Sequence, residues 1–174
     1  MPGFLRFLAG LLAVFVTHLL GVTFVPYFSS AIDLFLVLIV LEASRGDELR
    51  GMLAGVVTGF AEDALSGALY GLHGFAGTVV GFAVARTSRR MASQDPGVLG
   101  LVALGAQPLH ELVVALLESL LVPEGGRPDL AWVAARTLST AVLSFAVLVV
   151  GERLGQRYGD WQQTRPRRVK ISKG

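Results

Sequence analysis

The chain has 174 residues, of which 53% are hydrophobic, and its formal net charge at pH 7 is +2. A soluble domain of this size could not bury so much apolar sequence, so the composition indicates an integral membrane protein. There is no cysteine and there are three scattered histidines, which excludes disulfides and thiolate chemistry and argues against a zinc site.

Six apolar segments follow one another along the chain, and each is predicted to be a helix that crosses the membrane. A spanning helix needs about 20 residues, so the second segment is short. Turn-forming residues separate the segments. The predicted helices cover residues 4–24, 31–43, 48–66, 72–88, 98–122 and 130–151. We therefore predict an all-α bundle of six transmembrane helices as one domain over residues 1–152, followed by a basic tail over residues 153–174.

The distribution of basic residues predicts the orientation of the bundle, because cytoplasmic connections are enriched in Lys and Arg. With six spans, one side of the membrane would hold only Arg127, and Arg136 lies inside the sixth helix. The side that holds both termini carries Arg6, Arg45, Arg50, Arg86, Arg89, Arg90, Arg153, Arg157, Arg165, Arg167, Arg168, Lys170 and Lys173. Both termini are therefore expected in the cytoplasm, with the tail near anionic lipid head groups and not on nucleic acid.

Small residues recur at every fourth position through the third predicted helix and the connection after it. Such spacing lets two helix backbones approach closely. The residues are Gly51, Gly55, Gly59, Gly67 and Gly71, and the first helix carries a second pair, Ala9 and Ala13. Two interpretations remain open: packing within the bundle, or a docking face for a membrane helix of a partner protein.

Several polar side chains lie within the predicted helices, near the membrane surface opposite the two termini. A charged side chain inside the membrane is energetically costly unless it is paired or solvated. The residues are His18, Glu62, Asp63, Glu118 and Arg136. We expect them to form a buried cluster in the outer half of the bundle, with Arg136 neutralising Asp63 or Glu118, because its planar fork can satisfy two carboxylate oxygens. The alternative is that these side chains reach up to the interface separately.

A polar stripe on the fifth predicted helix is compatible with transport of an ion or a proton. Gln107, Glu111 and Glu118 share one face at i, i+4 and i+11, and such a stripe faces protein or a watery cavity. A proton or ion path would need a stripe of this kind. No enzyme signature is present, since the sequence lacks a nucleophile elbow, a phosphate loop and an HExxH motif, and no catalytic residue is assigned.

The central third of the chain resembles the MreD family of rod shape-determining membrane proteins. The resemblance rests on a short helix that starts with an acid (IDLFLVLIVLEAS), the pattern GxxxGxxxGFxxDxLSGxxxGLHG from Gly51 to Gly74, and a helix ending in ARTSRR. Asp33 stands where the family commonly begins this helix with Pro-Asp-Leu, and Ile32 replaces the proline.

The resemblance implies a non-catalytic component of the bacterial cell-elongation machinery in the cytoplasmic membrane, with no cofactor. Its implied partners are MreC, MreB, and RodA with its penicillin-binding protein. The family is also similar in fold to the S components of energy-coupling-factor transporters, whose small-residue motif Ala9 and Ala13 resemble. The alternative function is therefore an S-component-like membrane protein that binds a small molecule such as a vitamin.

Overall fold

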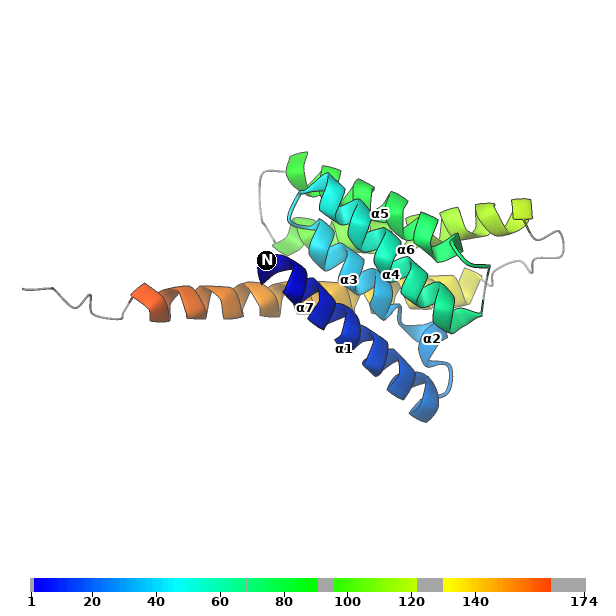
Figure 1. The fold of residues 1–174 in the computed structure, drawn as a ribbon, viewed down its shortest axis with the longest axis horizontal. Coiled ribbons are helices and arrows are strands. Elements are labelled where there is room, and N and C mark those ends of the chain that lie inside the picture. The colour runs from blue at the N-terminus through cyan, green and yellow to red at the C-terminus, as the bar shows by residue number, and fades with distance from the viewer. Residues whose placement is uncertain (1, 68, 91–95, 122–129, 164–174) are drawn as a thin grey trace, which may run out of the picture.

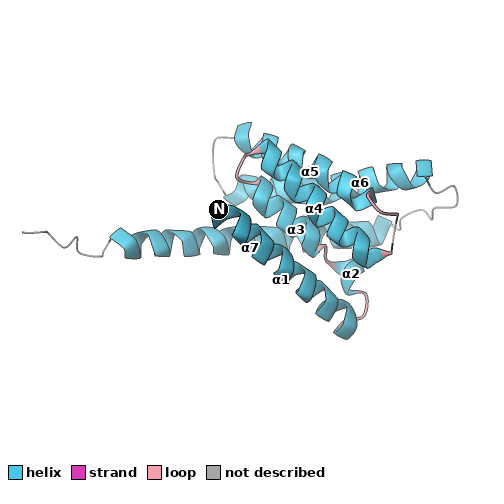
Figure 2. Cartoon of the chain, viewed as in Figure 1, coloured by secondary structure: helices cyan, strands magenta, loops and turns pink. Residues whose placement is uncertain are grey.

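The chain forms helices joined by short connections. The computed structural model describes residues 2–67, 69–90, 96–121 and 130–163, which contain no strand, so the all-α prediction is confirmed for them (Figures 1 and 2). The helices are α1 (Pro2–Phe24), α2 (Phe28–Ala31), α3 (Leu34–Ala43), α4 (Glu48–Ser66), α5 (Leu72–Arg90), α6 (Pro96–Leu121) and α7 (Leu130–Gln163).

Three described helices contain segments long and apolar enough to cross a membrane. These segments are Gly3–Phe24, Gly100–Leu121 and Val133–Val150. The helices α4 and α5 have 19 residues each but are less apolar. The structure therefore supports a helical membrane protein, while the count of six spans and the orientation stay predictions.

The short helix α3 is the centre of the bundle. It packs against α1, α4, α5, α6 and α7, and Phe35, Leu36 and Val40 are each 1% exposed. Apart from Glu42 near its end, its ten residues are apolar on all faces, as expected for a helix surrounded by other helices and not by lipid. The main core forms where α3 meets Val80 and Val84 of α5 and small residues of α6.

The predicted second helix, residues 31–43, is wrong in one respect: it is interrupted after Ala31. Asp33 has extended backbone angles (φ −101°, ψ 92°) and caps α3, since its Oδ1 accepts a hydrogen bond of 2.8 Å from the Leu36 N–H. The backbone groups freed by the break bond to α7. The Asp33 N–H donates to Thr140 Oγ1 (3.0 Å), and the Ser139 hydroxyl donates to the Ala31 carbonyl. A break at this depth is tolerated because neighbouring side chains replace the lost helical hydrogen bonds.

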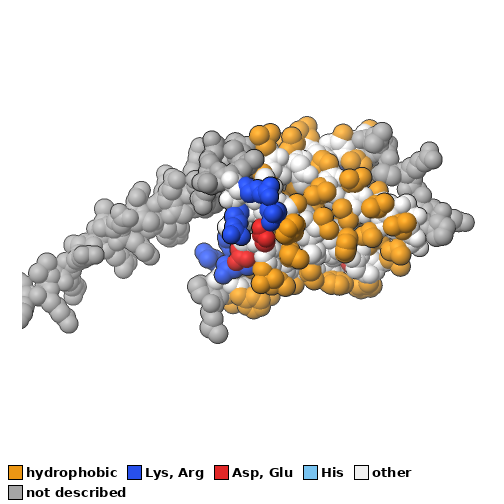
Figure 3. All heavy atoms as spheres, turned by 90° about the horizontal axis from the view of Figure 1, so that it is seen from above, with side chains coloured by type: hydrophobic (Ala, Val, Ile, Leu, Met, Phe, Trp, Pro, Cys, Tyr) orange, Lys and Arg blue, Asp and Glu red, His pale blue; other side chains and the backbone are white. Residues whose placement is uncertain are grey.

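Charged side chains gather at one end of the molecule, seen beside the grey residues in Figure 3. We call this the basic end and define it by Arg45, Arg50, Arg86 and Arg89. Each of these is exposed and lies within 4 Å of an acid at the start of α4 or the end of α3. The helix α7 continues past this end of the bundle to Gln163 (Figure 1), twelve residues beyond the predicted end at 151. The remainder of the predicted tail, 164–174, lies outside the described residues.

The helices α4 and α5 form the closest pair in the bundle, through glycines on both of them. Gly51 faces Gly81 and Gly55 faces Gly77, so closely that a Cβ at Gly77 would lie 2.7 Å from the Gly55 carbonyl oxygen. Gly59 lies in the same way against His73 and Gly74. Such contact brings Cα–H groups against carbonyl oxygens and leaves no room for side chains. We call this antiparallel contact the glycine seam.

Gly67 and Gly71 were predicted to continue this packing surface, and that prediction is wrong. Gly67 ends α4 in the left-handed region (φ 67°), with open space around it. Gly71 also has a positive φ of 96°. Both residues shape the connection between α4 and α5, where glycine adopts this backbone without the strain that a Cβ would cause.

Candidate functional site

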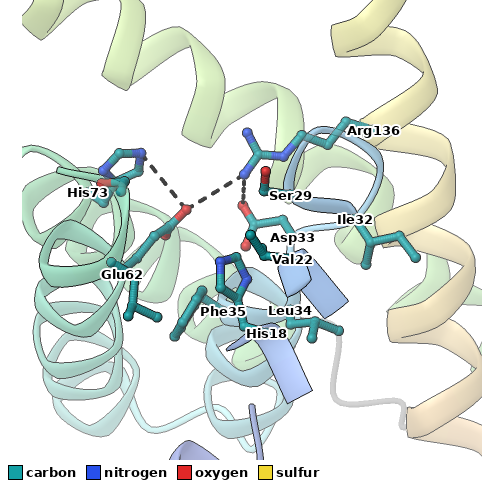
Figure 4. Close-up of a pocket in the computed structure, with 12 residues that line it drawn as sticks. His18, Val22, Ser29, Ile32, Asp33, Leu34, Phe35, Glu62, His73 and Arg136 are labelled. Atoms are coloured by element: carbon teal, nitrogen blue, oxygen red, sulfur yellow. Dashed lines mark hydrogen bonds and ion pairs between the residues drawn. The ribbon is translucent and has the colours of Figure 1, made fainter. Parts of the chain in front are cut away.

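A cavity of about 400 Å³ opens at the end of the bundle opposite the basic end, where α3 and α5 begin and α4 ends (Figure 4). Helices α1 to α5 and α7 all contribute to it. Its polar wall consists of His18, Ser29, Asp33, Glu62, Ser66, His73 and Arg136, and its apolar wall of Val22, Ile32, Leu34, Phe35 and Leu65. This volume lies within the range of small-molecule sites in proteins.

Arg136 of α7 is the centre of the polar wall. One terminal nitrogen, Nη2, lies 2.9 Å from Asp33 Oδ2, and the other, Nη1, lies 2.9 Å from Glu111 Oε1. Nη2 is also 3.6 Å from Glu62 Oε1. The guanidinium thereby joins four helices, α3, α4, α6 and α7, and most of it is shielded from solvent. Arginine suits this position because its two terminal nitrogens can face different carboxylates at once.

The structure corrects the expected partners of Arg136, which were Asp63 or Glu118. Asp63 is fully buried, and its two oxygens are occupied by the start of α5. They accept from the N–H groups of Gly71 (2.8 Å), His73 (3.0 Å) and Gly74 (3.3 Å), and from His73 Nδ1 (2.8 Å). The first N–H groups of a helix have no partner within the helix, and a carboxylate satisfies them well. Asp63 is therefore a cap for α5 rather than a member of the ion-pair cluster, and Glu118 makes no ion pair with Arg136.

Of the five residues predicted to cluster, His18, Glu62 and Arg136 do line the cavity. The His18 ring packs against Phe35 and Phe28, with centroids 5.1 and 6.2 Å apart. The prediction missed Asp33, Glu111 and His73 as members. Two signals for them were present in the sequence, namely the acid at the start of the second predicted helix and the polar stripe on the fifth. Gln107 and Glu111 of that stripe are hydrogen bonded at 2.8 Å.

Glu62 is the least satisfied acid of the cavity. It is 8% exposed, yet its two polar contacts, 3.6 Å to Arg136 and 3.8 Å to His73 Nε2, are both too long for hydrogen bonds. Figure 4 shows its carboxylate pointing between these two side chains. Its carboxylate lines the cavity and makes no hydrogen bond within the described residues, so Glu62 is the acid of this site most open to a ligand.

The glycines and alanines of the proposed packing faces have different surroundings. Gly51, Gly55 and Gly59 are buried in the glycine seam, whereas Ala9 and Ala13 of α1 are exposed. The matching glycines of α5, Gly74, Gly77 and Gly81, were not singled out in the sequence, although their spacing was visible there. The seam therefore belongs to internal packing, whereas the α1 pair is open to another helix.

The described residues contain no group of three or more His, Asp or Glu side chains placed to hold a metal ion. The side chains at the cavity can form hydrogen bonds and ion pairs with a small ligand. The guanidinium of Arg136 also links four helices.

Comparison with known proteins gives one positive result. The family model of the rod shape-determining protein MreD matches residues 2–126. A comparison with curated proteins and a comparison with solved structures gave no match, so the expected similarity to S components stays a prediction. The matched region contains the glycine seam, Asp33, Asp63 and the greater part of the cavity wall. The match covers well over half of the sequence, and the chain therefore belongs to the MreD family of rod shape-determining proteins.

Proposed function

We propose that this chain is a non-catalytic membrane scaffold of the bacterial cell-elongation complex, which supports side-wall peptidoglycan synthesis through helix–helix contacts. Its proposed partners are MreC, RodA with its penicillin-binding protein, and MreB. The proposal places the chain in the cytoplasmic membrane with both termini in the cytoplasm, because the basic residues concentrate on that side. Membership of the family supports the role in rod shape.

The observation that carries the proposal of helix–helix contacts is the outward face of α1. This helix packs mainly against α2 and α3 and lies at the edge of the bundle (Figure 1). Ala9 and Ala13 are exposed on it between large apolar side chains, among them Leu5 and Leu12, which are 70% and 65% exposed. Two small residues one turn apart between larger ones form a shallow groove into which another membrane helix can pack.

The glycine seam supports the same conclusion by elimination. Its glycines were the stronger candidates for partner docking, but α5 already occupies them. A partner helix that used this surface would have to displace α5. We therefore assign partner docking to α1 rather than to α4.

Co-purification from bacterial membranes tests the proposal. Ala13→Leu fills the α1 groove, and Ala146→Leu, on an exposed position of α7, adds the same volume elsewhere. We expect Ala13→Leu to lower the yield of co-purified MreC at least several-fold, while Ala146→Leu leaves it unchanged. Wild-type yields of MreC with both Ala9→Leu and Ala13→Leu would refute docking through α1.

A further inference from the structure

We propose that the cavity at the end of the bundle is a binding site for a small molecule that carries a primary ammonium group, with Glu62 as its principal anionic partner. This site goes beyond the scaffold role and does not depend on it. Three observations carry the proposal, namely the hydrogen-bonding state of His73, the charge balance around Arg136, and the remaining polar and apolar groups of the cavity wall.

The first observation is a missing donor between Glu62 and His73. Asp63 accepts four hydrogen bonds, so it is an acceptor only, and His73 Nδ1 at 2.8 Å must carry the hydrogen. In the neutral ring Nε2 then has a lone pair, which faces Glu62 Oε1 at 3.8 Å. Both acceptors line the cavity, so a donor placed between them could bond to each. An ammonium group supplies three N–H donors and can bridge both.

The second observation is an excess of negative charge. The terminal nitrogens of Arg136 are engaged by Asp33 and Glu111 at 2.9 Å each. Glu62 keeps only the longer contact of 3.6 Å to this guanidinium. When Asp33, Glu62 and Glu111 are all ionised, one cation serves three carboxylates, while the additional acid, Asp63, is satisfied by the start of α5. A cationic ligand next to Glu62 would restore the balance, and anions are disfavoured.

The third observation concerns the rest of the ligand. Arg136 Nε and His18 Nδ1 are buried, and neither has a hydrogen-bond partner within the part of the chain that the structure describes. Because both nitrogens are closed to the cavity, the exposed hydroxyl of Ser29, which lines it, is the group that can donate to an oxygen on the ligand. The apolar wall of Val22, Ile32 and Leu65 accommodates a short hydrocarbon segment. An amino alcohol, free or as the ethanolamine head group of a phospholipid, has this combination.

Thermal unfolding of the full chain in nanodiscs tests the proposal, because a ligand that binds only the folded state raises the midpoint. The nanodiscs contain phosphatidylcholine and phosphatidylglycerol, and the probes are ethanolamine, choline and propanoate. We expect ethanolamine to raise the midpoint in proportion to the logarithm of its concentration. Choline has no N–H donor and propanoate is an anion, so neither should raise it.

Two cavity variants and one control test whether the rise in the unfolding midpoint comes from ethanolamine bound in the cavity. Glu62→Gln removes the charge at almost constant volume and should weaken ethanolamine binding by roughly ten- to a hundred-fold, the usual range for a hydrogen bond to a charged group. Leu65→Phe should weaken it by filling the cavity while leaving every polar group in place. Glu118→Gln should behave like the wild type. If ethanolamine raises no midpoint, or raises that of Glu62→Gln as much as that of the wild type, the proposal is wrong.

A second pair of nanodiscs identifies the source of the amine. If the natural ligand is the phospholipid head group, replacing phosphatidylcholine by phosphatidylethanolamine should raise the wild-type midpoint without any probe, and added ethanolamine should then have no further effect. If the ligand is a free molecule, ethanolamine should raise the midpoint equally in both lipids. Glu62→Gln must weaken whichever effect occurs, and an effect as large in this variant as in the wild type would overturn the proposal.

Discussion

Gly55 of α4 and Gly77 of α5 touch through their backbones, with space for no atom beyond hydrogen between them. A Cβ on either residue would meet the carbonyl group of the other. The contact cannot be relieved by a change of rotamer, because the obstacle is backbone. The two helices would have to move apart along their length.

Gly55→Ala therefore tests the glycine seam. We expect it to lower the free energy of unfolding by about 1–3 kcal/mol or more, the usual cost of overpacking. The matched control is Gly105→Ala in α6, where a Cβ meets nothing within 4 Å. That change should be neutral or should stabilise the protein by up to about 1 kcal/mol, because alanine favours helix. Unfolding of the purified proteins in detergent gives both values, and equal values would contradict the seam.

Arg136→Ala tests the ion-pair cluster. The change leaves Asp33 and Glu111 without their cation, and breaking one partner of a buried pair typically costs about 3–5 kcal/mol. The control is Arg86→Ala at the basic end, whose pair with Glu48 at 3.2 Å is exposed, and such pairs contribute about 0–1 kcal/mol. In detergent, the midpoint of thermal unfolding of Arg136→Ala should be well below that of Arg86→Ala. Similar midpoints for the two variants would mean that the ion-pair cluster contributes little to stability.

Asp33 combines two roles that substitutions can separate. Asp33→Asn keeps an oxygen that can cap α3 but removes the charge that faces Arg136, whereas Asp33→Ala removes both. We expect Asp33→Ala to be less stable than Asp33→Asn by about 1 kcal/mol, the typical contribution of a helix cap. Combining each change with Arg136→Met in a double-mutant cycle isolates the ion pair. Additive effects on stability would show that the two side chains are not coupled.

Asp63→Ala tests the cap of α5. Three N–H groups, one buried and two partly buried, would lose their acceptor, so local opening at Gly71, His73 and Gly74 should become easier. Hydrogen exchange at these amides should accelerate by at least tenfold, while amides in the middle of α3 change less. Asp63→Asn keeps one accepting oxygen and should fall between the wild type and Asp63→Ala. Unchanged exchange at Gly71 in the alanine variant would exclude the cap.

Part of the fold could be predicted because its determinants are local. Helix α4 begins and ends as expected, since Asp47 caps its start and Gly67 adopts the left-handed conformation at its end. The interruption before α3 depends instead on Thr140 and Ser139, more than a hundred residues away. No local pattern around Ile32 contains that information.

The candidate site was also predictable only in part. Position along a helix predicts the depth of a side chain, which is why His18, Glu62 and Arg136 were expected at one level and do meet there. Depth does not determine the direction in which a side chain points around the helix axis. Adjacent residues such as Glu62 and Asp63 therefore have similar depths and different partners, one in the cavity and the other at the start of α5.

The glycine seam also limits how this protein can change shape. A screw motion of α4 by a single residue, which includes a rotation of about 100°, would bring Met52 or Val56 against backbone where a glycine now lies. Shear between packed helices usually proceeds by small shifts of interdigitating side chains, whereas this pair is in contact through its backbones. We expect α4 and α5 to move together as a rigid unit. Any rearrangement caused by a partner should then occur as a rotation of α1 or α7 relative to this pair.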